Sequence, residues 1–212
     1  MAILKINEKH TATAAITASV MFLCACVIFF LPVEIPHMIT ICTSILTIAS
    51  LWLCPWQITM ALLFSTLGDH MGSCGNFLGQ MGFFALAHIA YIVFFCRTCP
   101  QGRASDGMKW KSAIVALYGV VVGMLIVPHV HRFLQVGVSV YVLLILTMCI
   151  LSWRQKNPYY ALGAWLFVLS DTVLAWNKFV FHIEGASYLI MIPYYLGQWM
   201  LFIQSFKSAQ NA

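Results

Sequence analysis

Residues 132–152 read RFLQVGVSVYVLLILTMCILS, and this stretch decides the fold class. Arg132 is its only charged residue, and an α-helix needs about 20 mostly apolar residues to cross a bilayer. Similar stretches follow one another along the chain with only short polar breaks. In all, 62% of the 212 residues are hydrophobic and 8% are charged, against about 25% charged in an ordinary soluble domain. The sequence therefore predicts an all-α, polytopic transmembrane bundle.

Apolar windows and their polar, proline or glycine interruptions predict eight spans. Their expected bounds are residues 12–31, 37–54, 56–72, 77–96, 112–128, 132–152, 160–177 and 187–206. Pro193 lies inside the last span, where we expect it to kink the helix or to begin a broken turn. Because no soluble segment or long linker separates the spans, we expect residues 1–212 to form a single integral membrane domain.

Lysine and arginine residues indicate the orientation of the chain. With the N-terminus inside, nine of the 11 fall on the cytoplasmic side, and Arg132 and Lys178 fall on the other. Cytoplasmic loops are enriched in basic residues. We therefore expect both termini in the cytoplasm, the segment Arg97 to Lys111 as a cytoplasmic loop, and a bacterial inner (cytoplasmic) membrane. The net charge of +5 is scattered over loops without an aromatic-rich basic patch, so nucleic acid is not an expected partner.

Two aspartates lie within apolar runs, Asp69 in the third predicted span and Asp171 in the seventh. A buried acid costs at least about 2.5 to 3.5 kcal/mol on membrane insertion, which indicates a functional role. The alternative is that each carboxylate satisfies a helix end. Their segments are similar, LFSTLGD at 63–69 and LFVLSD at 166–171, which suggests two parallel four-helix halves. We expect both acids in the outer half of the bundle, facing one cavity as an acid/base pair.

Other polar side chains lie on the adjoining spans. His88 and Tyr91 share a helical face in the fourth span, and Tyr194 and Gln198 are one turn apart in the last. Lys178 follows Asp171 by about two turns and can meet a phosphate at headgroup level or extend to the interface as an ordinary lysine. Interhelical hydrogen bonding explains such residues without chemistry, and both interpretations stay open.

Signals for a metal or a cofactor are weak. Most of the eight cysteines lie in or beside apolar runs, where cysteine packs as a small hydrophobe. Cys96 and Cys99 form a single C-x-x-C pair without a second pair or a nearby histidine, so packing is the preferred interpretation. His129 and His131 are two residues apart and cannot share a helical face. We expect no metal and no cofactor.

Five stretches carry a family pattern, in this order: LFSTLGD (63–69), GFFALAHIAY (82–91), ALGAWLFVLSD (161–171), WNKF (176–179) and YYLGQ (194–198). In series they resemble the YhhN-type lysoplasmalogenases, which are small multispanning membrane proteins. They cover most of the third, fourth, seventh and eighth predicted spans. The family usually carries Lys-Pro early in the second span, whereas Ile35 precedes Pro36 here. A headgroup contact by that lysine is therefore missing.

The resemblance implies that the substrate is a lysoplasmalogen, a lysophospholipid with a vinyl ether bond. Hydrolysis of this bond in lysoplasmenyl-ethanolamine or -choline gives a fatty aldehyde and glycerophospho-ethanolamine or -choline. The reaction passes through an oxocarbenium ion, which glycosidases manage with two carboxyl groups. Asp69 and Asp171 are therefore the expected catalytic pair, on the order of 5 to 9 Å apart by analogy with glycosidases. No metal or organic cofactor is required.

Substrate-binding or supporting roles are expected for nine further residues: Ser65, His88, Tyr91, Ser170, Asn177, Lys178, Tyr194, Tyr195 and Gln198. The competing interpretation is a proton-coupled or lipid transporter that uses the same buried acids. A membrane assembly factor without catalysis is a third. Headgroup preference, the identity of the acid, the route of substrate entry and the oligomeric state stay open at this stage.

Overall fold

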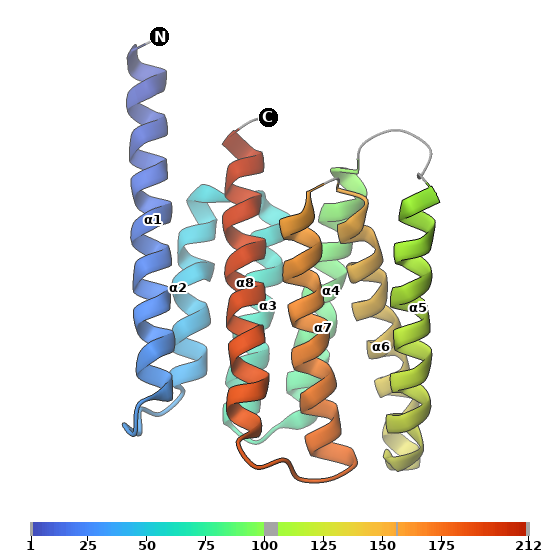
Figure 1. The fold of residues 1–212 in the computed structure, drawn as a ribbon. Helices are drawn as coiled ribbons and strands as arrows, with labels where there is room; N and C mark the ends of the chain where they lie inside the picture. Colours follow the sequence, from blue (N-terminus) through green and yellow to red (C-terminus); the bar gives the residue numbers. More distant parts are fainter. Residues whose placement is uncertain (1, 100–105, 156, 211–212) are drawn as a thin grey trace. The chain divides into compact units, whose positions relative to one another are not determined.

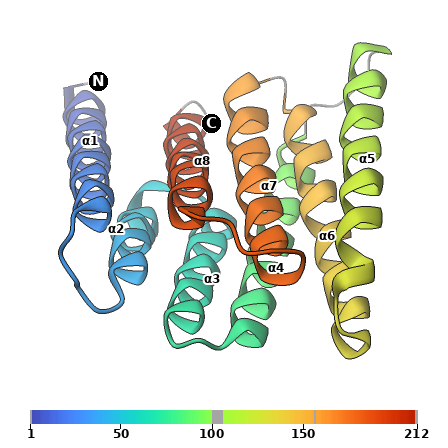
Figure 2. The ribbon, with the colours of Figure 1, turned by 60° about the horizontal axis from the view of Figure 1, so that its bottom comes forward.

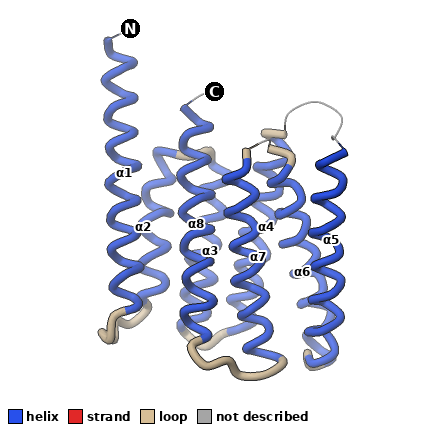
Figure 3. The backbone as a smooth tube through the Cα atoms, in the orientation of Figure 1, coloured by secondary structure: helices blue, strands red, loops and turns tan. Residues whose placement is uncertain are grey.

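The computed structural model describes residues 2–99, 106–155 and 157–210, and within these ranges it is helical without any strand (Figure 1, Figure 3). The helices are α1 (Ala2–Phe30), α2 (Met38–Leu53), α3 (Trp56–Ser73), α4 (Phe77–Arg97), α5 (Asp106–Ile126), the short 3-10 helix η1 (Val127–His129), α6 (Arg132–Trp153), α7 (Pro158–Phe179) and α8 (Ala186–Gln210). Arg103, in the predicted cytoplasmic loop, and Lys156 lie outside the described residues.

Six helical segments of the described chain are long and apolar enough to cross a membrane. They are Lys9–Phe30, Phe77–Arg97, Lys109–His129, Arg132–Trp153, Pro158–Phe179 and Ala186–Gln210. These segments coincide with six of the predicted spans and fit a membrane helical bundle. Helices α2 and α3 also form where spans were predicted, but neither is among the six.

Length and polarity explain why α2 and α3 differ from the others. Helix α2 has 16 residues, or about 24 Å, against a hydrocarbon core of about 30 Å. Helix α3 has 18 residues and buries four polar side chains, namely Gln57, Ser65, Thr66 and Asp69. Eight complete membrane crossings therefore stay a prediction, as do two parallel halves.

Three helices extend well beyond the predicted boundaries. Helix α5 begins at Asp106 rather than at residue 112, so the end of the loop predicted at 97–111 is helical, and α8 ends at Gln210 rather than at residue 206. Helix α1 begins at Ala2 rather than near residue 12, because residues 2–30 contain neither glycine nor proline to stop it. The predicted start was that of the apolar run alone.

Helix α8 continues without a break through Pro193, so of the two predicted outcomes the broken turn is wrong and the kink stays a prediction. The Ser170 hydroxyl of α7 donates to the Ile190 carbonyl (2.9 Å) in the turn before the proline, whereas the carbonyl that Pro193 itself leaves without a helical donor is that of Leu189.

The chain divides into two compact units. Unit 1 comprises Met1–Ala90 and Leu201–Ala212, and unit 2 comprises Tyr91–Met200. Within unit 1, α1 packs on α2 and α2 packs on α3 (Figure 2). Within unit 2, α5 packs on α6 and α6 packs on α7 (Figure 2). Each unit thus contains three helices that are consecutive along the chain and packed side by side.

Close helix packing in each unit depends on a glycine. A Cβ atom on Gly68 of α3 would lie 3.0 Å from the Phe84 ring of α4, in unit 1. In unit 2, a Cβ atom on Gly197 of α8 would lie 2.9 Å from the Gly163 carbonyl oxygen of α7. Because a backbone oxygen cannot move aside as a side chain can, the α7–α8 contact requires glycine at position 197.

Candidate functional site

Asp69 lies on α3 with only 4% of its surface exposed. The hydroxyl of the fully buried Thr43, on α2, donates to its Oδ2 atom at 2.8 Å. One turn further along α3, the Ser73 hydroxyl donates to the Asp69 carbonyl (2.9 Å). A hydrogen bond to a carboxylate is stronger than one between neutral groups. The Asp69 carboxyl group is therefore held in place by the neighbouring helix.

Hydroxyl groups continue along the contact between α2 and α3. The Thr47 and Thr66 hydroxyls lie 2.8 Å apart, and the Thr59 hydroxyl donates to the Ser50 carbonyl (3.0 Å). We call these residues, with Thr43, the α2–α3 hydroxyl seam. Sequence reasoning missed the seam, although its signal was present. Residues 43, 47 and 50 are hydroxyl-bearing and recur at the three- and four-residue spacing of one helical face.

Ser65 and His88 are the other predicted site residues of unit 1. Both are fully buried, Ser65 on α3 and His88 on α4. The Ser65 hydroxyl has no hydrogen-bond partner among the described residues. Ser65 precedes Asp69 by one helical turn, so both lie on the same side of α3. A buried hydroxyl without a partner is rare in proteins and is suited to binding a water molecule or a ligand.

Asp171 lies on α7 in unit 2 and is half-buried. The Tyr141 hydroxyl, on α6, donates to its Oδ2 atom at 2.5 Å. The next residue, Thr172, accepts a hydrogen bond from the Tyr118 hydroxyl of α5 (3.0 Å). Tyr141 was not predicted as a site residue, although a phenol in the middle of the apolar stretch at 132–152 was visible in the sequence. Two tyrosines from two helices thus reach the Asp171 turn.

Three predicted site residues of unit 2 form one hydrogen-bonded chain. The Tyr91 hydroxyl donates to Gln198 Oε1 at 2.9 Å, and Gln198 Nε2 donates to the Tyr194 hydroxyl at 3.3 Å. All three side chains are buried. The Tyr195 ring is also buried and lies 5.6 Å from that of Tyr194, centroid to centroid. The structure therefore brings α4 and α8 together through polar groups predicted from separate motifs.

The remaining three predicted residues lie along α7. Ser170 is buried, and its hydroxyl donates to the Ile190 carbonyl as described above. Asn177 Oδ1 accepts from the Ile183 backbone N–H (2.8 Å), which ties the α7–α8 loop to the end of α7. Lys178 is exposed in the last turn. Ser170 and Asn177 therefore have structural contacts, whereas Lys178 is accessible.

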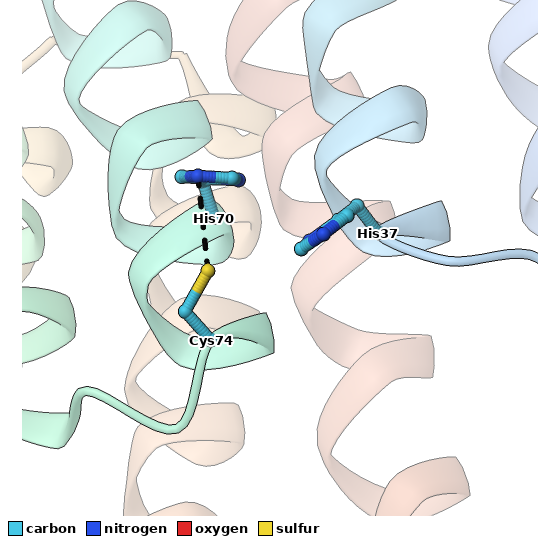
Figure 4. Close-up of side chains that lie close together, drawn as sticks. All are labelled: His37, His70 and Cys74. Carbon is cyan, nitrogen blue, oxygen red and sulfur yellow. Dashed lines mark hydrogen bonds between the residues drawn. The ribbon is translucent and has the colours of Figure 1, made fainter.

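One cluster of potential metal ligands is present among the described residues, and sequence reasoning missed it. It consists of His37, His70 and Cys74 in unit 1 (Figure 4). The signal was His70 and Cys74 at helical spacing, but His37 is distant in sequence. Cys96, of the predicted C-x-x-C pair, is exposed rather than packed.

Comparison with known proteins agrees with the family resemblance of the five sequence stretches. The model of the YhhN family matches residues 35–205, which include both aspartates and all nine supporting residues. Lysoplasmalogenase TMEM86A of Bos taurus is 27% identical to this chain, over 88% of the chain and 86% of its own length. Lysoplasmalogenase TMEM86B of Sus scrofa is 34% identical over 65% of the chain and 58% of its own length. No solved structure matches the chain at a significant level.

Proposed function

This chain belongs to the YhhN family, and from this premise we propose that it is a lysoplasmalogenase, a hydrolase of the vinyl ether bond in lysoplasmalogens. The observation that carries the proposal is the match over residues 35–205 together with relatives of that name. Six apolar helical segments identify an integral, multi-pass membrane protein. An amphiphilic lysophospholipid is a substrate that such a protein meets in its own surroundings.

Vinyl ether hydrolysis defines what the site must supply. Protonation of the alkenyl carbon that is not bonded to oxygen creates an oxocarbenium ion. Water then adds to the carbon that carries the ether oxygen and gives a hemiacetal. Its collapse breaks the bond from that carbon to the ether oxygen, which leaves as the hydroxyl of the glycerophospho compound and yields a fatty aldehyde. The site needs a proton donor, an anion beside the cation and one positioned water molecule.

We assign the two acid/base roles to Asp69 and Asp171. Each carboxyl group accepts a hydrogen bond from a hydroxyl group on a neighbouring helix, and this supports the assignment. The donor is Thr43 for Asp69 and Tyr141 for Asp171. Such donors fix the orientation of a carboxyl group, which general acid/base catalysis requires. Both residues also lie in stretches that resemble the family. One carboxyl group donates the proton, and the other stabilises the cation and activates water.

Supporting roles follow from burial and exposure. The Ser65 hydroxyl, buried without a partner one turn from Asp69, is proposed to hold the attacking water or a substrate oxygen. Supporting roles in substrate binding are proposed for the hydrogen-bonded chain Tyr91–Gln198–Tyr194 and for His88, Tyr195, Ser170 and Asn177. Lys178 is exposed at the end of α7 and is proposed to contact the substrate phosphate.

A transporter would also use buried acids, but one feature favours an enzyme. Transport sites are commonly formed by discontinuous helices. Helix α8 instead continues without a break through Pro193. The two functions also differ in what they require, since hydrolysis proceeds in detergent micelles whereas transport needs two compartments.

Purified protein in detergent tests the proposal. We expect fatty aldehyde from 1-alkenyl lysophospholipids with ethanolamine or choline headgroups, and none from the matching 1-alkyl compound, which lacks the double bond. Glu184→Gln serves as a control, because Glu184 is an exposed acid of the α7–α8 loop. This variant should retain full activity. A folded protein that releases no aldehyde from either headgroup class would contradict the proposal.

We place both termini in the cytoplasm. The nine-to-two split of basic residues supports this orientation. A contact within unit 1, where Gln210 Nε2 of α8 donates to the Thr11 hydroxyl of α1 at 3.0 Å, supports placing both ends on the same side. Reporter fusions after residue 212 and near Asp106 should report cytoplasm, and an insertion near Glu184 should report the opposite side. Opposite locations for residues 106 and 212 would overturn this topology.

A further inference from the structure

Two histidines and a cysteine meet at one end of unit 1 (Figure 4). His37 ends the loop between α1 and α2 and precedes the first residue of α2. His70 and Cys74 lie in the last turn and at the C-terminal cap of α3. The three ligand atoms, two imidazole nitrogens and one sulfur, all lie within 4.8 Å of one another. Three side chains from two chain segments therefore converge on one small volume.

The α3 half of this cluster is close to metal-binding geometry. Cys74 Sγ lies 3.8 Å from His70 Nε2. Two such atoms bound to a tetrahedral zinc ion lie about 3.5 Å apart, given bonds of about 2.3 Å to sulfur and 2.0 Å to nitrogen. The Cys74 backbone N–H donates to the His70 carbonyl (3.0 Å), so the helical turn extends to the cysteine and holds the pair in register. A small side-chain rotation suffices to place both on one ion.

The α2 half is held in an unusual conformation. His37 has φ 57° and ψ 28°, and it is the only residue other than glycine with positive φ among the described residues. Its ring lies 5.0 Å from that of His70, centroid to centroid, at an interplanar angle of 39°. Side chains in this backbone region occur mainly where surrounding contacts fix them, and they are common at ligand sites. The conformation places the His37 imidazole against the α3 pair.

We propose that His37, His70 and Cys74 bind one zinc-class divalent ion, with water as the fourth ligand. Two imidazoles and a thiolate form a borderline-soft donor set that suits Zn²⁺ and excludes Mg²⁺ and Ca²⁺, which take oxygen ligands. His37 and Cys74 are exposed, so a hydrated ion can reach them. Binding replaces the thiol proton: the S–H bond breaks, a sulfur–metal bond forms and one proton enters solution.

The bound ion fastens the α1–α2 loop to the end of α3. His70 directly follows Asp69, so the ion fixes the turn that carries this acid. Metal binding at this cluster does not depend on lysoplasmalogenase activity, because binding and spectroscopic measurements detect the ion without substrate. An inactive protein that binds the ion would refute only the proposed function, and an active protein that binds no ion would refute only this one.

Cobalt(II) titration of the metal-free, full-length protein in detergent is the first test. Co²⁺ reports its own coordination through absorption. We expect one ion per chain, the intense bands of a tetrahedral site, a thiolate-to-cobalt charge-transfer band, and displacement by Zn²⁺. A weak octahedral spectrum without the charge-transfer band would overturn the proposal, because it indicates adventitious binding at surface histidines.

Variants separate the site from the rest of the chain. His37→Gln, His70→Gln and Cys74→Ser should each weaken Co²⁺ binding by more than about 100-fold, since loss of an outer-shell partner alone costs 10- to 100-fold. Cys74→His supplies another ligand and should retain binding without the charge-transfer band. Cys96→Ser, which removes an exposed thiol from unit 2, is the matched control and should bind as the wild type does. Wild-type binding by Cys74→Ser would overturn the proposal.

Alkylation of the wild-type protein avoids any dependence on variant folding. Zn²⁺ should slow maleimide labelling of Cys74 by at least about tenfold, because a metal-bound thiolate is a poor nucleophile. Labelling of Cys96, an exposed thiol that does not belong to the histidine–cysteine cluster, should not change. Equal labelling rates for Cys74 with and without Zn²⁺ would contradict the assignment.

Discussion

The two aspartates come from similar segments, LFSTLGD and LFVLSD, but their surroundings differ. Asp69 is almost completely buried against α2, where it accepts a hydrogen bond from Thr43 of the α2–α3 hydroxyl seam. Asp171 is half-buried and accepts a hydrogen bond from a phenol of α6, a helix whose sequence is strongly apolar. Similar motifs therefore do not imply similar environments. One acid lies in a polar helix contact, and the other accepts a short hydrogen bond from a tyrosine of an apolar helix.

We expect the two aspartates to be held in position in different ways. The polar α2–α3 contact stabilises unit 1 through many small interactions, so no single hydroxyl should dominate. In unit 2 the Tyr141 hydroxyl makes a shorter hydrogen bond to Asp171 than the Thr43 hydroxyl makes to Asp69, so we expect its loss to matter more. Substitutions test this comparison. At each aspartate, one change removes only the charge of the acid, and another removes only the hydroxyl group that donates to it.

The largest effects are expected at the acids themselves. Asn is nearly isosteric with Asp but neither donates a carboxylic proton nor carries the anion. Asp69→Asn and Asp171→Asn should each reduce aldehyde release by about 100- to 10,000-fold, the range of general acid/base catalysis. Folding should be retained, and the apparent Tm of each variant checks this. Near wild-type turnover by either folded variant would remove that aspartate from the mechanism.

Intermediate effects are expected at the two hydroxyl donors. Tyr141→Phe removes a 2.5 Å bond to Asp171, and Thr43→Val removes a 2.8 Å bond to Asp69. Shorter O–H···O⁻ bonds are stronger. Turnover should fall about tenfold in Tyr141→Phe, equivalent to about 1.4 kcal/mol, and about threefold in Thr43→Val. Steady-state rates of aldehyde release decide the order, and a larger loss in Thr43→Val would reverse the comparison drawn above.

The smallest effects are expected within the α2–α3 hydroxyl seam. Thr47→Val or Thr66→Val alone should destabilise the protein by about 1 kcal/mol, because the remaining hydroxyl loses one buried partner. That corresponds to a fall in apparent Tm of about 2–4 °C. The double variant should cost less than the sum of the two, since both partners are then apolar. Additive losses in thermal unfolding would show that the two hydroxyls do not interact.

Much of the fold could be predicted because a membrane helix is encoded locally. Apolar length and the positions of prolines located the eight α-helices of the described residues, and the bounds failed where a helix extends beyond the apolar run, as in α1 and α5. At Pro193 the prediction left a kink and a broken turn open, because contacts from a neighbouring helix, such as that of Ser170 with the Ile190 carbonyl, are not contained in a local pattern.

The candidate site could be predicted less completely for the same reason. Buried acids are conspicuous in an apolar sequence, so Asp69 and Asp171 were readily found. Their donors were not, because threonine and tyrosine are unremarkable in a span until packing brings them against a carboxyl group. His37 and Cys74 belong to different segments, and only the fold brings them together.

The most direct test of the central claim is the rate of aldehyde release by the Asp69→Asn/Asp171→Asn double variant, compared with both single variants and the wild type. Residues that act as one catalytic unit are strongly non-additive. If the two carboxyl groups share one reaction, the double variant should be no slower than the slower single variant, within about threefold. A rate reduced by the product of the two single effects would show that the aspartates act independently and would contradict the two-carboxylate account.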